Sequence, residues 1–178
     1  NENGASLLKE LGVTRVVLAR EVPIEEVKKI SKIIDTEIFI HGALCFSSSG
    51  NCLMSSVIGR RSGNRGKCAQ PCRKLYSIYE DDKVIEENKS ILSMNDLNTL
   101  DYMINILNSG VSSLKIEGRM KSPEYVYTVT KAYRDIIDQI YKENRYKINS
   151  KTIDNVLVTY NRGFTKGYLF NELNSLIV

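Results

Sequence analysis

Apolar residues follow two kinds of spacing along the chain, and these spacings predict helices and strands in alternation. Residues 4–11 predict a short helix, and Gly12 suits the position that follows a helix. Residues 14–19 (TRVVLA) show no polar alternation, which is typical of a strand buried on both faces. Pro23 begins a helix, and residues 37–41 (EIFIH) predict the next strand. The apolar face of that helix has the helical period and consists of Ile24, Val27, Ile30, Ile33 and Ile34.

The same alternation resumes in the second half of the chain. Residues 96–108 predict a helix with one apolar face, and residues 112–116 (SSLKI) predict a strand. Ser122 and Pro123 then supply the capping residue and the first residue of a helix that runs to position 144. Helices and strands joined in this order by short connections are the signature of α/β units with parallel strands. The sequence therefore predicts the α/β fold class.

Two segments fall outside this alternation. Residues 42–74 show no clear periodicity, and an insertion of this length is usually functional or disordered. Residues 74–79 and 83–87 predict a small β-hairpin. Residues 145–178 predict a polar linker and a basic, aromatic tail, which we assign to the same domain as residues 1–144.

Composition places the chain among soluble globular proteins. Its 178 residues fit one domain, with 42% apolar and 26% charged residues. No apolar stretch approaches the ~20 residues that a membrane span requires, and a net charge of +4 does not by itself argue for nucleic acid. The chain does not begin with Met, so we interpret it as a fragment excised from a longer, cytoplasmic protein. In such a protein, cysteines favour metal ligation over disulfides.

All four cysteines of the chain lie in the irregular segment, at Cys45, Cys52, Cys68 and Cys72. Zinc sites generally combine two tight C-x2-C pairs. Here the closest pair is spaced i,i+4, and the other pair is seven residues apart. These loose spacings favour a cuboidal iron–sulfur cluster, which takes four thiolates from well-separated positions. Zinc ligation, free buried thiols and a catalytic cysteine remain open as alternatives.

A run of basic residues with no acid among them occupies the second half of this segment. The run consists of Arg60, Arg61, Arg65, Lys67, Arg73 and Lys74. It predicts either a solvated loop or a surface that binds phosphate groups. The tail motif NRGFTKGY adds two aromatic residues, Phe164 and Tyr168. Their rings either pack against the domain or stack on an unpaired base.

Charged residues also follow the predicted strand at 112–116. Ser113, Lys115 and Glu117 share one face of this strand because side chains alternate with a period of two, and Arg119 comes shortly after. A lysine–glutamate pair at the carboxyl end of a strand predicts either a clamp for an anionic ligand or a structural ion pair.

His41 is the single histidine and therefore the single candidate imidazole base for a serine or cysteine protease. The period of two puts it on the same strand face as Glu37 and Phe39. A dyad with Cys45 would break the four-cysteine set and leave three thiols unexplained. The chain also has no HExxH zinc-protease motif. A hydrogen-bonded histidine at a strand end is the alternative interpretation.

Several motifs in this part of the chain resemble a known signature. The first reads E-x-F-x-x-G-A-L-C (residues 37–45) and continues, after four residues, as G-x-C-x-M-S (residues 50–55). Three further blocks are NRGxCxQxCR (64–73), KIEGRMKSP (115–123) and NRGFTxGY (161–168). Together they closely resemble peptidase family U32, the collagenase-like peptidases, over nearly the whole chain.

The resemblance implies both a fold and a cofactor. The fold is the later part of a (β/α) TIM-like barrel, in which residues 1–144 form a partial barrel region with a cysteine loop at 42–74 and a small hairpin. Several members of the family carry a 4Fe–4S cluster on four cysteines, so the resemblance implies such a cluster on the four thiols of this chain. Zinc is the alternative occupant.

The resemblance also implies a function. The members most similar to this chain act in oxygen-independent hydroxylation of RNA, on wobble uridine in tRNA or on a cytidine in ribosomal RNA, with prephenate metabolism implicated as the oxygen source. We therefore expect an RNA-modifying hydroxylase. A collagenase-like peptidase and a non-enzymatic binding module stabilised by zinc or by thiols are the alternatives.

Residues and partners follow from this expectation. The catalytic candidates are Lys115, Glu117, Arg119 and His41, and the candidates for RNA binding are Arg60, Arg61, Arg65 and Arg73. A second family subunit is a further candidate partner. The exposed strand edge of a cut barrel is expected to make the fragment self-associate as a dimer. The isolated fragment is expected to be inactive, because the missing strands would supply part of the pocket.

Overall fold

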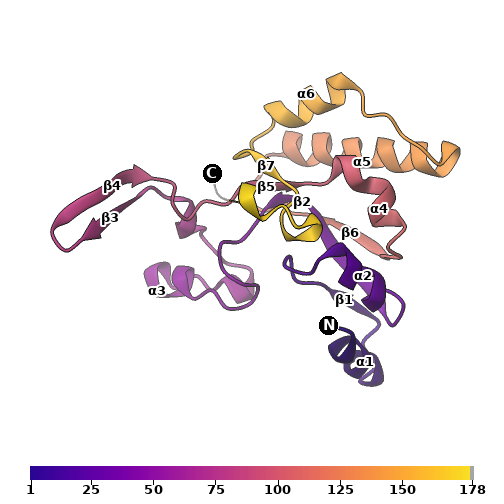
Figure 1. Cartoon of the computed structure of the whole chain (residues 1–178), viewed down its shortest axis with the longest axis horizontal. Coiled ribbons are helices and arrows are strands. Elements are labelled where there is room, and N and C mark those ends of the chain that lie inside the picture. The colour runs from indigo at the N-terminus through magenta and orange to yellow at the C-terminus, as the bar shows by residue number, and fades with distance from the viewer. Residues whose placement is uncertain (177–178) are drawn as a thin grey trace.

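The sheet is built around one long strand, β2 (Asp35–Ala43), as Figure 1 shows. The structure is a computed structural model that describes residues 1–176. β1 (Arg15–Val17) and β6 (Ser113–Ile116) both pair with β2 in parallel. Helices separate these strands along the chain, and the strands lie in the sheet in their sequence order. The predicted α/β class is therefore confirmed.

The sheet is open rather than closed into a barrel. β5 (Asp96–Asn98) pairs antiparallel with the end of β2, and β7 (Phe164–Thr165) pairs in parallel with β5. Within residues 1–176 the strands do not close on themselves. The order β1, β2, β6 is the order that consecutive barrel strands have, but the predicted TIM-like barrel is not confirmed, because residues 1–176 form an open, mixed sheet.

Helices cover the face of the sheet on which Ile38 and Ile40 lie. These two side chains form the main core with Val27, Met103 and Val129, which come from three different helices. The α-helices outside the irregular segment are α1 (Glu2–Glu10), α2 (Ile24–Ile30), α4 (Met103–Leu107), α5 (Pro123–Glu143) and α6 (Ser150–Val158). Among residues 1–176, no helix is both long and apolar enough to cross a membrane.

The strand predicted at 14–19 is shorter and less buried than its apolar run suggests. Only residues 15–17 form β1, and Val17 is 52% exposed, whereas Val16 packs towards α1 and α2. Val17 lies on the face opposite the helices, level with Glu37 of β2. The prediction of burial on both faces is wrong here, because within residues 1–176 that face has no second layer over Val17.

The segment predicted as one helix at 96–108 is divided into a strand, a 3-10 turn and a helix. Its first three residues are β5, a 3-10 turn follows at Leu100–Tyr102, and α4 begins only at Met103. Tertiary pairing overrides helix periodicity at this point, because Leu97 pairs with Gly42 on one side and with Thr165 on the other. This strand brings Asp96 to the end of β2.

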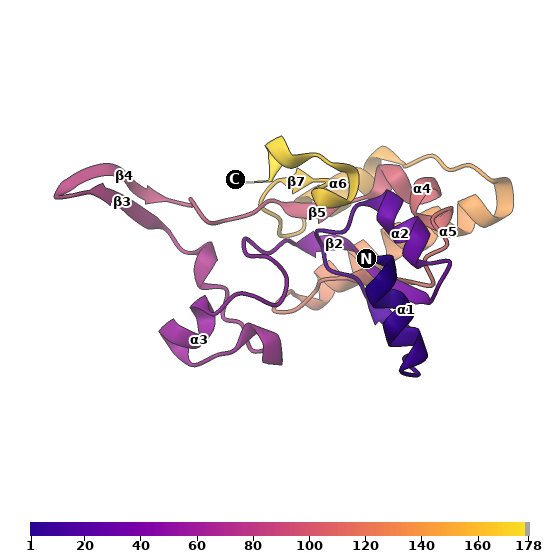
Figure 2. The ribbon, with the colours of Figure 1, turned by 60° about the horizontal axis from the view of Figure 1, so that its bottom comes forward.

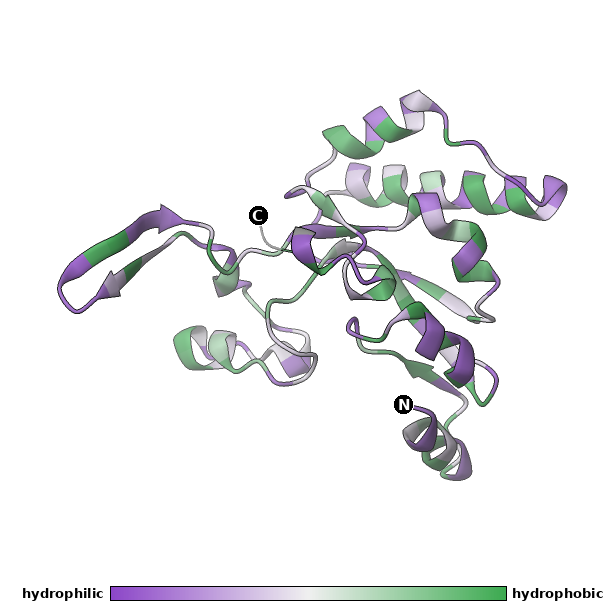
Figure 3. Ribbon diagram, viewed as in Figure 1, coloured by the Kyte–Doolittle hydropathy of each residue, from purple (hydrophilic) through white to green (hydrophobic). Residues whose placement is uncertain are grey.

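The irregular segment contains short elements, and a projecting arm follows it. The short elements are α3 (Met54–Gly59) and two 3-10 turns, Gly63–Arg65 and Pro71–Arg73. The arm is the predicted hairpin, confirmed as β3 (Tyr76–Glu80) and β4 (Lys83–Lys89), and both views show it extending away from the body (Figures 1 and 2). Figure 3 shows apolar residues along the arm between its polar ends.

The tail predicted at 145–178 packs against the rest of the molecule. α6 contributes Val156 to the main core, and Phe164 packs against the same core. Tyr168 packs against a smaller cluster formed by Leu44, Met94, Leu97 and Leu176. The two tail aromatics therefore adopt the packing alternative, and residues 177–178 of the tail lie outside the described residues.

Candidate functional site

A cavity of about 210 Å³ lies where the irregular segment meets the ends of β2 and β6. Its lining includes all four cysteines, Cys45, Cys52, Cys68 and Cys72. Cys45 follows β2 and Cys52 precedes α3, while Cys68 precedes the 3-10 turn Pro71–Arg73 that leads into the arm and Cys72 lies within that turn. Thiols that are up to 27 positions apart in the sequence (72 − 45) are thus brought to one place.

Hydrogen bonds within the segment hold its two halves together. The Asn64 side chain donates from Nδ2 to the carbonyl oxygen of Gly50 at 2.8 Å, and the Ala69 amide donates to Ser55 Oγ at 3.0 Å. The Gln70 amide donates to the sulfur of Cys68 at 3.3 Å. These bonds join the chain around Cys52 to the chain around Cys68.

Four thiols can serve two kinds of metal site, which differ in the spacing that they require. A tetrahedral zinc ion needs its sulfur ligands ~3.8 Å from one another, given Zn–S bonds of about 2.3 Å. Among residues 1–176, no three His, Cys, Asp or Glu side chains lie close enough to hold one ion. A 4Fe–4S cuboid binds each thiolate through a different iron, so it takes thiols that stand further apart. The four thiols that line one cavity are the donor set that such a cluster takes.

Three charged residues form the wall of the cavity beside the sheet: Arg20, Glu117 and Arg119. Glu117 Oε2 accepts from Arg20 Nη2 at 3.2 Å, and Glu117 Oε1 accepts from the Arg119 amide at 3.0 Å. The Arg20 guanidinium also stacks 3.8 Å from the centre of the Phe39 ring. Burial lowers the pKa of Arg20, and the carboxylate of Glu117 opposes this shift. Glu117 and Arg119 therefore lie where the thiols are.

Lys115 does not lie at the cavity. Its Nζ donates to Glu37 Oε1 at 2.9 Å, and Ser113 Oγ donates to Glu37 Oε2 at 2.9 Å. The hydrogen bond from Lys115, followed by that from Ser113, lowers the pKa of Glu37. The lysine–glutamate pair suggested by the sequence is thus replaced by two other pairs. Lys115 pairs with Glu37 on the neighbouring strand β2, and Arg20, which follows β1, pairs with Glu117, which follows β6.

His41 is buried on the helix side of the sheet and does not line the cavity. It is 1% exposed, and its Nδ1 lies 3.1 Å from the hydroxyl of Tyr133 on α5. The prediction that His41 shares a strand face with Glu37 and Phe39 is wrong because of a β-bulge. Phe39 pairs with Lys115 but His41 pairs with Ile116, so Ile40 is the extra residue. The bulge interrupts the period of two, and His41 no longer shares a face with Glu37 and Phe39.

Acidification is expected to destabilise the fold through His41. Burial lowers the pKa of His41 from 6.5 to about 4, so between these values the unfolded chain binds a proton that the folded chain does not. Stability is then full above pH 6.5 and falls as the pH decreases to about 4, by on the order of 3 kcal/mol. Urea unfolding at several pH values in this window measures the slope. A His41→Gln variant should lose most of it, and an unchanged slope in that variant would contradict this assignment.

The four candidate RNA-binding arginines divide into two groups. Arg60, Arg61 and Arg65 are exposed on the segment that carries the thiols. Arg73 is half-buried, and its guanidinium donates to Ser93 Oγ at 3.1 Å and to the carbonyl oxygens of Leu44 and Met94. Its charged group thus points into the molecule, away from any RNA that would lie across the surface.

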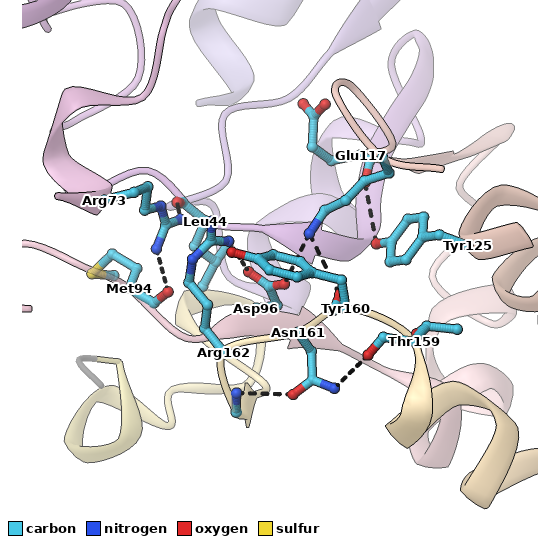
Figure 4. A network of polar contacts seen from close by, with 12 residues as sticks. Leu44, Arg73, Met94, Asp96, Glu117, Tyr125, Thr159, Tyr160, Asn161 and Arg162 are labelled. Carbon is cyan, nitrogen blue, oxygen red and sulfur yellow. Dashed lines mark hydrogen bonds and ion pairs between the residues drawn. The ribbon is translucent and has the colours of Figure 1, made fainter. Parts of the chain in front are cut away.

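Sequence reasoning missed a buried ion cluster around Asp96, shown in Figure 4. Asp96 is 1% exposed, and its two carboxylate oxygens lie 3.5 Å from Arg162 Nη1 and 3.8 Å from Lys121 Nζ. Lys121 Nζ also lies 3.8 Å from the centre of the Tyr160 ring. Burial raises the pKa of Asp96 and lowers that of Lys121. Both basic residues occur in the motif blocks quoted above, and that is the signal that could have singled them out.

Comparison with known proteins gives a family and several relatives. A family model described as peptidase family U32 matches residues 1–176. The chain is 40% identical over 142 residues to a 23S rRNA 5-hydroxycytidine synthase of Escherichia coli, which covers 78% of this chain and 22% of that protein. It is also 40% identical over 147 residues to a tRNA hydroxylation protein of Bacillus subtilis, covering 78% of this chain and 35% of that protein.

A third relative carries a different kind of name. The chain is 36% identical over 175 residues to a protein named collagenase from Porphyromonas gingivalis, covering 88% of this chain and 42% of that protein. The chain therefore spans less than half the length of each of these three relatives. No solved structure matches it.

Proposed function

Because the chain belongs to peptidase family U32, we propose that it is the cofactor-holding part of an enzyme that hydroxylates a pyrimidine nucleoside in RNA without molecular oxygen. The observation that carries this proposal is the convergence of four thiols, Glu117 and Arg119 on one cavity. Two relatives at 40% identity, named for hydroxylation of ribosomal RNA and of tRNA, support the same chemistry.

The thiols would hold a 4Fe–4S cluster. Each of the four cysteines is partly exposed and outside any disulfide, and each lines the cavity. When bound, such a cluster supplies one-electron chemistry beside the substrate. The loose spacing of the cysteines in the sequence and their gathering at one cavity support such a cluster.

The opposite wall would orient the substrate. Glu117 accepts hydrogen bonds from the guanidinium of Arg20 and from the backbone amide of Arg119. These bonds hold both arginines at the cavity. Arg119 also donates to the carbonyl oxygen of Gly66 at 3.0 Å, which ties the end of β6 to the cysteine loop. Positive charge fixed in this way favours an anionic group in the cavity.

The exposed arginines would meet the RNA. Arg60, Arg61 and Arg65 carry positive charge without a neighbouring acid in the loop that walls the cavity, an arrangement that suits phosphate contacts. A base must leave its stack to reach such a cavity, so the loop would bind the backbone on either side of an unpaired nucleotide. Arg73 is left out of this set, because its guanidinium points inward.

The peptidase alternative lacks a catalytic set among the described residues. His41 is 1% exposed and pairs with Tyr133, so it is not available as a base at the cavity. The name of the Porphyromonas gingivalis relative keeps proteolysis as the alternative to test, but the geometry of residues 1–176 favours the hydroxylation proposal.

Nucleoside analysis of a deletion strain tests the proposal. We expect one hydroxylated pyrimidine nucleoside to disappear from either tRNA or ribosomal RNA, to return with the full-length wild-type gene, and to stay absent with a Glu117→Gln gene. Glu124→Gln is the matched control, since Glu124 is an exposed acid at the start of α5, away from the cavity lining. Mass spectrometry of digested, separately purified RNA fractions gives the readout. An unchanged profile in the deletion strain would overturn the proposal.

A further inference from the structure

The Arg73 guanidinium binds main-chain and hydroxyl oxygens rather than a carboxylate. Nη2 donates to the carbonyl oxygen of Leu44, while Nη1 donates to Ser93 Oγ at 3.1 Å and to the carbonyl oxygen of Met94. Figure 4 shows this fork between the two carbonyl groups. Leu44 and Met94 are each 3% exposed. If a carbonyl in such surroundings loses its donor, the folded state is destabilised by the full desolvation penalty of that carbonyl.

These contacts join three segments that are distant in the sequence. Leu44 immediately precedes Cys45 at the exit of β2, Arg73 immediately follows Cys72, and Met94 lies two residues before β5. The contact from Arg73 to Leu44 spans 29 positions. The Arg73 side chain therefore connects the chain next to Cys72 with the chain next to Cys45 and with the segment that leads into β5.

The other two cysteines are connected by different bonds. The contacts from Asn64 to Gly50 and from Ala69 to Ser55 join the chain around Cys52 to the chain around Cys68. The four thiols thus form two pairs. The loop's own hydrogen bonds hold the inner pair, and Arg73 holds the outer pair, Cys45 with Cys72.

We propose that Arg73 is a positioning residue that fixes the separation of Cys45 and Cys72, so that the loop holds a four-iron cluster stably. This inference rests on the proposed function, because it takes the cluster as the ligand of the thiols. The planar guanidinium is essential, because its two terminal nitrogens donate to the carbonyl oxygens of Met94 and Leu44, which lie in two different segments. The single nitrogen of a lysine cannot reach both oxygens. Arg73→Lys should therefore fail as Arg73→Gln does, although it keeps the charge.

The first test measures iron in full-length protein purified without oxygen. Wild type, Arg73→Lys, Arg73→Gln and Arg60→Gln are compared by iron per chain, visible absorbance and the rate of iron release to a chelator. Loss of an orienting group around a metal site typically weakens binding about 10–100-fold. We expect both Arg73 variants to release iron at least about tenfold faster than wild type. Arg60→Gln removes an exposed charge from the same loop, and it should hold and release iron as wild type does.

A second test needs no metal. In Cys52→Ser/Cys68→Ser protein, Cys45 and Cys72 are the cysteines left among these 178 residues, and peptide mapping by mass spectrometry follows the disulfide between them. Adding Arg73→Lys should change the rate at which that disulfide forms under a mild oxidant by about tenfold or more in either direction, because the separation of the two thiols would no longer be fixed, and an unchanged rate would count against the inference. If wild-type protein holds no iron, the proposed cluster fails, and this disulfide rate still decides the role of Arg73.

Several results would overturn the inference. Iron release from Arg73→Lys at the wild-type rate, with fast release from Arg73→Gln, would assign the effect to charge alone. Equal rates of iron release in all variants would show that Arg73 has no role in holding the cluster. If the Arg73 variants do not fold, as shown by far-UV circular dichroism, Ser93→Ala replaces them because it deletes a single contact of the fork. It should release iron measurably faster than wild type, and an unchanged rate in that variant would also count against the inference.

Discussion

Replacing Asp96 by asparagine is expected to lower the free energy of unfolding by about 3–5 kcal/mol. The substitution keeps the shape of the side chain but removes the negative charge that faces Lys121 and Arg162. The side chains of these two basic residues are only 9% and 15% exposed, so the uncompensated positive charges cannot simply turn to water. Urea unfolding at neutral pH, with the slope of the transition as a check on two-state behaviour, measures the change.

A matched control separates this effect from the loss of any ion pair. Asp138 pairs with Arg134 on the surface of α5, where both side chains are 54% exposed, and Asp138→Asn should change stability by only about 0.5 kcal/mol. Adding Lys121→Gln to Asp96→Asn should recover part of the lost stability, because it removes one of the stranded charges. Equal effects of Asp96→Asn and Asp138→Asn would show that the buried cluster contributes no more than a surface pair.

The second large effect concerns the proposed cluster itself. Cys72→Ser is expected to reduce iron from about four atoms per chain to near zero in full-length protein purified without oxygen, because an alcohol does not replace a thiolate as an iron ligand at neutral pH. Iron and zinc are measured together by elemental analysis. Ser48→Ala is the control, since Ser48 lines the same cavity without a thiol.

Two outcomes would contradict the cluster. Wild-type protein that contains zinc in place of iron would assign the thiols to a different metal. A Cys72→Ser protein that keeps its full iron content would remove this thiol from the ligand set. Both measurements are independent of enzymatic activity, so they do not rely on knowing which RNA is the substrate.

The sequence predicted elements whose signals are local. The cap formed by Ser122 and Pro123 begins α5, and the Ser122 hydroxyl accepts from the amide of Tyr125 as a capping residue should. The hairpin was also predicted, because its strands and its turn are close in sequence. The loop that carries the thiols was recognisable for a different reason, since its cysteines and glycines form motifs that do not depend on periodicity.

Predictions failed where distant segments decide the local structure. Residues 96–98 have helical periodicity, but pairing with β2 and β7 makes them a strand. A bulge after Phe39 turns His41 to the helix side, and no local pattern announces a bulge. Arg73 belongs to a basic run in the sequence, yet carbonyl groups 21 and 29 positions away bind its guanidinium.

The use of β2 by three partner strands has a consequence for the folding of this protein. β1, β5 and β6 all pair with β2, and each brings part of the site: Arg20 follows β1, Asp96 lies in β5 and Glu117 follows β6. The contact of Glu37 with Ser113 closes a separation of 76 positions. Contacts between residues so far apart in the sequence form slowly, because closing the intervening chain loses conformational entropy before the contact contributes any stability. We therefore expect the wall of the cavity to form together with the rate-limiting step of folding, so that the thiols meet Glu117 only in a chain that has essentially completed its fold.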